Sequence, residues 1–190
     1  MENSTESSAS SSIIALKYGF INGLLSFLFS TLVNVMGWAE DFQESMGWIS
    51  GIWSLVLAVT ISLLCLREYR EQNGGFISYG QGLGLATLLG AISGLVAGGF
   101  NYIYIQFIDN TVIQRQMDMA RERMEDQGLS ASQIQSAEEV TRMFLHPGIQ
   151  FVIVVIMGIV FNFFIGLIVS AIETFLDPPP LKYYSLQVQE

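Results

Sequence analysis

The segment from Gly80 to Phe107 constrains the fold most, because it contains no Asp, Glu, Lys or Arg. Small residues recur there at every fourth position, in one stripe along a helix: Ala86, Gly90, Gly94 and Gly98. In a soluble helix each glycine costs roughly 1 kcal/mol relative to alanine, whereas in a bilayer such a stripe lets a second backbone approach closely. The segment is therefore predicted to be the central packing helix of a multi-pass membrane protein.

The distribution of charge predicts three further spans of the same kind. Hydrophobic residues make up 51% of the chain and charged residues 13%, against about 25% charged residues in ordinary globular domains. The charges lie almost entirely between long apolar windows, which is typical of membrane helices. We predict an all-α membrane protein with one domain at 13–175, a four-helix bundle with spans at about 13–36, 46–66, 80–107 and 148–172. The last span carries its own small and polar stripe: Gly158, Asn162, Gly166 and Ser170.

Three segments are expected to lie outside the spans. The serine-rich residues 1–12 have no apolar face and are predicted to be disordered, without the basic region of a cleavable signal peptide. Residues 109–146 show apolar stripes at helical spacing, separated by Gly128, which predicts an extracytoplasmic helical hairpin between spans three and four. Residues 176–190 form a proline-rich tail, in which three consecutive prolines favour an extended conformation.

The basic residues predict the orientation. Lys17, Arg67, Arg70 and Lys182 fall on one side of a four-span arrangement, and the first connection on the other side has no Lys or Arg. Basic residues are enriched on the cytoplasmic side, so both termini are predicted to be cytoplasmic. The segment 109–146 carries four arginines that oppose this orientation, but the first helix usually dominates.

Composition argues against several function classes. With a net charge of −9 and only eight Lys and Arg, nucleic acid is not an expected partner. There is one cysteine, Cys65, and one histidine, His146, so no Cys or His pair can bind a metal. We expect no cofactor and no catalytic site, because no nucleophile and base or metal constellation can be assembled. The chain is therefore predicted not to be an enzyme.

Three segments resemble the landmarks of a known family. They are Ala15–Gly19 in the first span, Asn73–Gln81 before the third, and Gly166–Ser170 in the last. Together they are similar to a domain-of-unknown-function family of small four-helix integral membrane proteins, found mainly in Bacteroidota. His146 departs from the asparagine that members tend to have before the corresponding proline. The resemblance spans roughly residues 13–175 and implies a bacterial inner-membrane protein, but it implies no activity.

Two functions follow as hypotheses. The first is a non-enzymatic scaffold or accessory subunit, which acts in the lipid bilayer through helix packing and its outer loop, as a homo-oligomer or with a membrane-protein partner. A possible docking loop consists of Asn73, Gly74, Gly75, Phe76 and Tyr79, although turn formation alone also explains these residues. The alternative is a small transporter or channel with a polar path near Asn22, Thr87 and Asn162, and this alternative requires a polar cavity inside the bundle.

Overall fold

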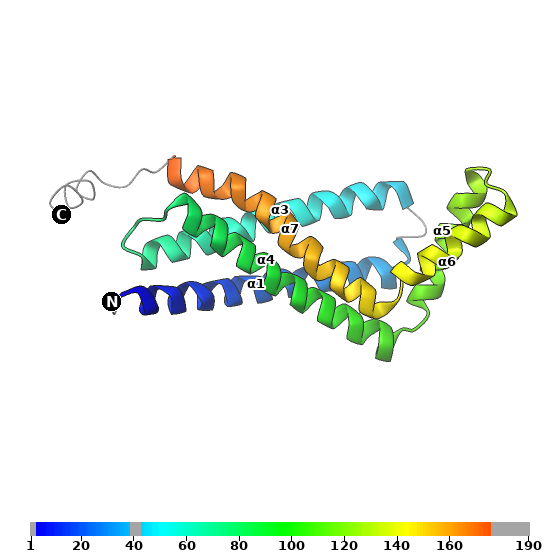
Figure 1. Cartoon of the computed structure of the whole chain (residues 1–190), viewed down its shortest axis with the longest axis horizontal. Coiled ribbons are helices and arrows are strands. Elements are labelled where there is room, and N and C mark those ends of the chain that lie inside the picture. Colours follow the sequence, from blue (N-terminus) through cyan, green and yellow to red (C-terminus); the bar gives the residue numbers. More distant parts are fainter. Residues whose placement is uncertain (1–2, 39–42, 176–190) are drawn as a thin grey trace.

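The structure, a computed structural model, describes residues 3–38 and 43–175, and every regular element in these ranges is a helix (Figure 1). Four helices are long and apolar enough to cross a membrane. They are α1 (Asn3–Val35), α3 (Gln43–Gln72), α4 (Tyr79–Ile103) with its π-helical continuation η1 (Tyr104–Ile108), and α7 (Pro147–Phe175). This confirms the prediction of an all-α chain with four candidate spans.

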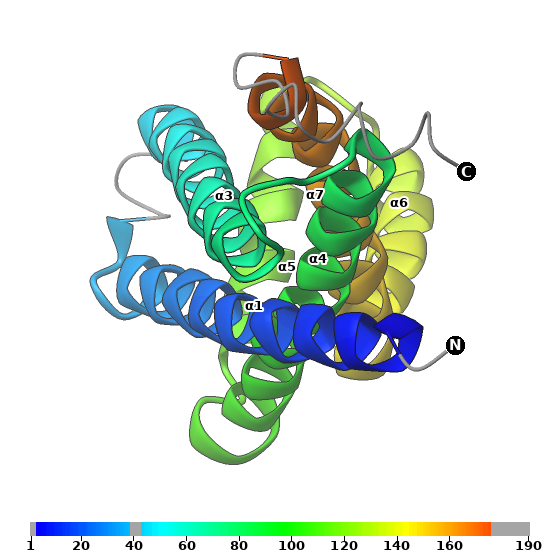
Figure 2. The ribbon, with the colours of Figure 1, turned by 90° about the vertical axis from the view of Figure 1, so that its left-hand side faces the viewer.

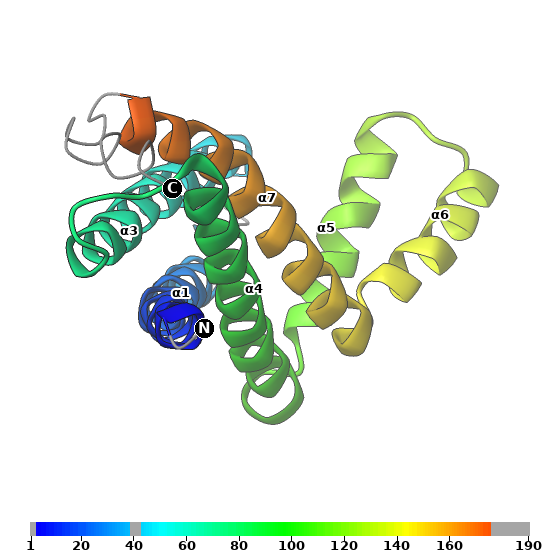
Figure 3. The same ribbon diagram turned by 60° about the vertical axis from the view of Figure 1, so that its left-hand side comes forward.

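Two shorter helices lie between η1 and α7. They are α5 (Val112–Asp126) and α6 (Ala131–Phe144), and Figure 3 shows them beyond one end of the long helices. Gly128 adopts a φ of 73° in the turn between them, a conformation that glycine reaches without strain. Ser130 and Gln133 form the capping box that begins α6.

The structure differs from the sequence-based boundaries at both ends of the bundle. Residues 1–12 were predicted to be disordered, but α1 begins at Asn3. Extending an existing helix adds a hydrogen bond for each residue and needs no new nucleus, so a serine-rich segment can continue the span. The proline-rich tail, 176–190, lies outside the described residues. The third span was expected to be one helix to Phe107, but its backbone widens into η1 at Tyr104.

Helix α4 lies at the centre, with α1 along one side and α7 along the other (Figure 2). Glycines of all three helices make these contacts, and they show how close the backbones are. A Cβ atom added at Gly23 of α1 would lie 2.6 Å from the carbonyl oxygen of Ser93 in α4. One added at Gly94 of α4 would lie 2.8 Å from the Cα of Val155 in α7. Such contacts admit no side chain, so the glycines set the distance between the helices.

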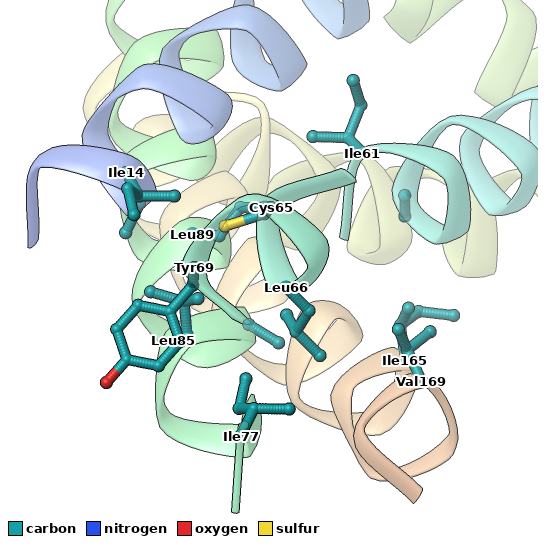
Figure 4. Close-up of a cluster of buried hydrophobic side chains, with 13 residues drawn as sticks. Ile14, Ile61, Cys65, Leu66, Tyr69, Ile77, Leu85, Leu89, Ile165 and Val169 are labelled. Carbon is teal, nitrogen blue, oxygen red and sulfur yellow. The ribbon is translucent and has the colours of Figure 1, made fainter. Parts of the chain in front are cut away.

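The buried apolar core occupies one end of the bundle. We call this the core end; there α1 and α4 begin and α3 and α7 finish. Side chains from all four long helices meet there (Figure 4), and the fully buried ones include Cys65, Leu66, Leu89 and Val169. The opposite end, which adjoins α5 and α6, is called the loop end. The first half of α3, residues 46–57, lies at the loop end and has no buried residue.

Candidate functional site

The two predicted stripes of small residues face each other across the α4–α7 interface. A Cβ atom added at Gly90 would lie 2.5 Å from the carbonyl oxygen of Gly158 and 2.5 Å from the Cβ of Asn162. One added at Gly166 would lie 2.8 Å from the Cβ of Ala86. Gly98 meets the ring of Phe151 rather than a stripe residue, and Ser170 faces Gly82. The stripes therefore form a continuous close contact, and they position Asn162 at the middle of the bundle.

A cavity of about 320 Å³ lies between the four long helices, on the loop-end side of the apolar core. We call it the chamber. Its polar lining consists of Asn22 and Ser26 from α1, Ser54 from α3, Ser93 from α4 and Asn162 from α7. Apolar side chains such as Met157 and Phe161 supply most of the remaining wall. A mostly apolar cavity with a few convergent polar groups is the usual form of a small-molecule site.

The two asparagines of the chamber are each held by one hydrogen bond. Asn22 donates from Nδ2 to Oγ of Ser93 at 2.8 Å, and Asn162 donates from Nδ2 to the carbonyl oxygen of Gly158 at 2.9 Å. Only 4% of Asn22 and 3% of Asn162 is exposed. The Oδ1 atom of each has no hydrogen-bond partner in the described part of the chain. Two buried acceptors, each with its amide anchored, are therefore left unpaired.

A second cavity, of about 260 Å³, continues from the chamber toward the loop end. Ser26, Ala97 and Val154 line both cavities, so the two adjoin at these residues. We call this second cavity the vestibule. Its further lining is rich in hydroxyl and amide groups from α1, α4, η1 and α5, namely Ser30, Thr31, Asn34, Asn101, Tyr104 and Gln116. Polar groups thus extend from the start of α5 to the middle of the bundle.

Charge is confined to other parts of the molecule. Among the residues that the structure describes, no Asp, Glu, Lys, Arg or His lines the chamber or the vestibule. The same described ranges contain no group of three His, Cys, Asp or Glu that could hold a metal ion. The arrangement can therefore supply hydrogen bonds and apolar contacts to a neutral molecule, but it presents no charged group to an ion.

The predicted polar trio is only partly brought together. Asn22 and Asn162 share the chamber, but Thr87 lines neither cavity, and its hydroxyl donates to the carbonyl oxygen of Leu83 in its own helix at 2.7 Å. Ser93 takes the place that the hypothesis gave to Thr87. Sequence position does not distinguish the two residues, since Ser93 adjoins Gly94 of the packing stripe and Thr87 adjoins Ala86 of the same stripe.

Ion pairs join the helices at the core end, and sequence reasoning missed them. Glu173 of α7 is 7% exposed and accepts hydrogen bonds from Nε of Arg67 at 3.2 Å and Nη1 of Arg70 at 3.5 Å. Glu68 accepts from Nζ of Lys17 at 2.6 Å and from the hydroxyl of Tyr18 at 2.7 Å. From the sequence, Lys17, Arg67 and Arg70 were used only to predict the orientation. Which of them pair depends on helix rotation, for which the sequence holds no local signal.

The predicted docking loop forms the turn between α3 and α4. Gly74 and Gly75 adopt φ values of 71° and 87°, which favour glycine. Nδ2 of Asn73 donates to the carbonyl oxygen of Phe76 at 2.9 Å, and Ser78 and Gln81 cap the start of α4. Turn and capping chemistry therefore accounts for most of this segment, and docking stays a prediction.

His146 lies on a separate cavity of about 580 Å³, formed by α6 and the start of α7. Its Nδ1 accepts a hydrogen bond from the backbone N–H of Gly148 at 3.2 Å. This bond satisfies a donor at the start of α7, where backbone N–H groups lack partners within the helix. His146 therefore has a structural contact, and it stands apart from the chamber.

Comparison with known proteins identifies the family. Residues 17–175 match the family described as protein of unknown function, DUF4199. The chain belongs to the DUF4199 family. This confirms the resemblance to a domain-of-unknown-function family. The match covers most of the first helix that is long and apolar enough to span a membrane and the whole of the other three. No curated protein and no solved structure matches the chain.

Proposed function

We propose that this DUF4199 protein is a small membrane transporter or channel that admits a neutral solute from the loop end into the chamber. The observation that carries the proposal is the pair of adjoining cavities, whose polar groups lead from the start of α5 to Asn22 and Asn162. A dry, tightly packed bundle would have argued against transport. Among the two hypotheses from the sequence, the cavities favour the transporter.

The contrast between the ends supports a chamber that opens to one side at a time. The apolar core and the ion pairs of Glu68 and Glu173 close the core end. A solute that reaches Asn162 from the vestibule therefore meets a barrier, and passage requires the core end to open. Transporters commonly bind substrate near the bilayer midplane and alternate access around that site. Coupled ions usually require an ionisable residue in a span, so we propose passive movement.

The proposed setting is the bacterial inner membrane with both termini in the cytoplasm. Lys17, Arg67 and Arg70 lie at the core end, which agrees with an excess of basic residues on the cytoplasmic side. In this orientation α5 and α6 form an extracytoplasmic hairpin, and the vestibule opens outward.

Uptake of glycerol into vesicles that contain the purified protein tests this proposal. Stopped-flow light scattering should show faster glycerol uptake than in protein-free vesicles. Ala97→Leu should return the rate to that of protein-free vesicles, because the side chain would fill the junction of the two cavities. Gly84→Leu adds the same side chain to an exposed and open position of α4 and should leave uptake unchanged. Equal rates with and without the protein would overturn the proposal.

A second candidate is the scaffold or accessory subunit, which the first half of α3 favours. Trp48, Ile52 and Val56 are 79%, 60% and 56% exposed, and the added Cβ atoms of Gly47 and Gly51 would meet nothing within 4 Å. Small residues four apart on an exposed helix can pack against another helix. Crosslinking in native membranes, followed by purification, tests for a partner or a second copy. If Gly51→Leu leaves every crosslink unchanged, this face is not the contact.

A further inference from the structure

We infer that the end of α6 inserts an apolar stripe into the leaflet at the loop end, where acyl chains of the bilayer cover Val140, Met143 and Phe144. This contact would anchor the hairpin of α5 and α6 to the membrane surface. It requires only that the four long helices lie in a bilayer, and it involves neither the chamber nor transport. The uptake test of the proposed function therefore cannot decide it.

The stripe consists of three large apolar side chains that α5 leaves uncovered. Val140, Met143 and Phe144 are three and four positions apart, which places them on one side of α6. They are 53%, 60% and 55% exposed, whereas Ile134 of the same helix is 8% exposed and α5 is the main neighbour of α6. The side of α6 that packs against α5 is therefore a different one. Contiguous exposed apolar surface marks a contact with a protein or a membrane.

The exposed apolar surface of the last span adjoins the stripe. Helix α6 ends at Phe144, and α7 begins at Pro147, at the loop end of the bundle (Figure 3). Exposed apolar side chains start in the first turns of α7, where Ile149, Val152 and Ile153 are 36%, 51% and 38% exposed. Such side chains therefore continue from the span to the end of α6. This continuity favours the bilayer, rather than a protein, as the partner of the stripe.

Two other segments carry exposed apolar side chains at the same end. The third span ends in η1, where Phe107 and Ile108 are 79% and 71% exposed. Trp48, near the start of α3, is 79% exposed, and tryptophan is enriched where a span meets the headgroups. The chain thus presents apolar side chains at the loop end of three spans, and one leaflet would cover all of them together with the end of α6.

Charged side chains of the same turns lie on the other side of α6. Residues two positions apart are on nearly opposite sides of a helix, so Arg142 lies away from both Val140 and Phe144. Glu138 lies away from Val140 for the same reason, and its Oε1 is 3.7 Å from Nη1 of Arg121 in α5. A helix with one apolar and one charged side is suited to the boundary between headgroups and acyl chains. The stripe itself has no basic residue, so burial of apolar surface would hold it there.

Quenching of a fluorophore on the stripe tests the inference. Phe144→Cys is labelled with a nitrobenzoxadiazole maleimide and reconstituted into phosphatidylcholine vesicles, and the unmutated chain, whose Cys65 is fully buried, gives the background. Phosphatidylcholine with a nitroxide on its acyl chain should quench the label, and aqueous iodide should quench it several-fold less than the same label on Ser136→Cys. Ser136 is the matched control, because it is exposed on the same side of α6 but lies roughly 12 Å farther from α7.

Val140→Cys repeats the measurement and replaces Phe144→Cys if that variant does not give a monodisperse protein. Iodide quenching equal to that at Ser136 would overturn the inference, because the stripe would then face water. Shielding from both iodide and the nitroxide lipid would also overturn it, because a second copy or another protein would then cover the stripe. None of these outcomes bears on glycerol uptake, so failure here is distinguishable from failure of the proposed function.

Discussion

The core end and the loop end of the bundle are built from the same four long helices but differ in how the space between them is filled. At the core end Cys65, Leu66 and Leu89 are fully buried, and ion pairs join α1, α3 and α7. At the loop end the same helices surround the chamber and the vestibule. Half of the bundle therefore has an ordinary packed core, and the other half has cavities that are largely apolar with several polar groups in their lining.

Helix α3 accounts for the difference. The α4–α7 contact extends through both halves, because four glycines face α7 along the length of α4, namely Gly82, Gly90, Gly94 and Gly98. The second half of α3 contributes Ala58, Ile61, Cys65 and Leu66 to the core, whereas residues 46–57 contribute no buried side chain. The α4–α7 pair is therefore in close contact in both halves, and the position of α3 decides whether the space beside this pair is filled by side chains.

The largest effect is expected from the contact that both ends share. Gly94→Leu should prevent a stable bundle, because even the Cβ atom would lie 2.8 Å from the α7 backbone and neither helix can move without losing the other contacts. Gly84→Leu, at an open position of the same helix, should be tolerated. Detergent thermostability and size-exclusion profiles compare the two. Gly128 is unsuitable as the control, since its φ of 73° makes any side chain there strained. Equal tolerance of both variants would contradict the shared-contact interpretation.

The second-largest effect is a difference in stability between substitutions in the two halves of α3. Leu66→Ala should lower the free energy of unfolding by about 2–4 kcal/mol, because Leu66 is fully buried and its removal leaves a void. Leu55→Ala removes the same atoms from a side chain that is 48% exposed and should cost much less. Chemical denaturation in micelles measures both. Similar losses would show that the first half of α3 is packed in the membrane.

A smaller effect is expected from the ion pairs of the core end. Glu173→Gln should cost about 1–2 kcal/mol, since the loss of a buried partner is expensive but the side chain of Arg67 is 63% exposed and can be solvated. The exposed Glu71 lies at the same end, and Glu71→Gln serves as the control. If Glu173→Gln opens the core end, glycerol uptake should also rise. An unchanged stability would show that the pair contributes nothing to closing that end.

The smallest effect concerns the start of α5. Hydrogen bonds from Thr111 and Arg115 lower the pKa of Asp109 below its ordinary value of 3.8. A lowered pKa means that the contact stabilises the folded state above the ordinary value and is lost as the pH falls through the folded pKa. The protection factors of the α5 amides, which correct hydrogen exchange for its intrinsic pH dependence, should therefore be unchanged between neutral pH and about pH 5, and lower only in strong acid. In Asp109→Asn this acid-dependent change should disappear.

Much of the architecture could be predicted because its signals are local. The spans follow from length and hydropathy, and the stripe at Ala86, Gly90, Gly94 and Gly98 follows from spacing. The serine-rich start was predicted wrongly, since its composition has no apolar face and yet the helix continues back to Asn3. The candidate site was predicted in part, because Asn22 and Asn162 are polar residues within spans. Thr87 has the same character, and only the tertiary structure shows that it lines neither cavity.

By itself, the sequence determined that four apolar helices form and that α4 and α7 carry small residues at helical spacing, because hydropathy and periodicity act within each segment. The tertiary structure alone decided that α3 leaves the bundle at the loop end, that Glu173 meets Arg67 and Arg70, and that Asn22 and Asn162 share a cavity. Those features depend on the tilt and rotation of each helix. Tilt and rotation are set by packing against neighbouring helices, which no single segment specifies.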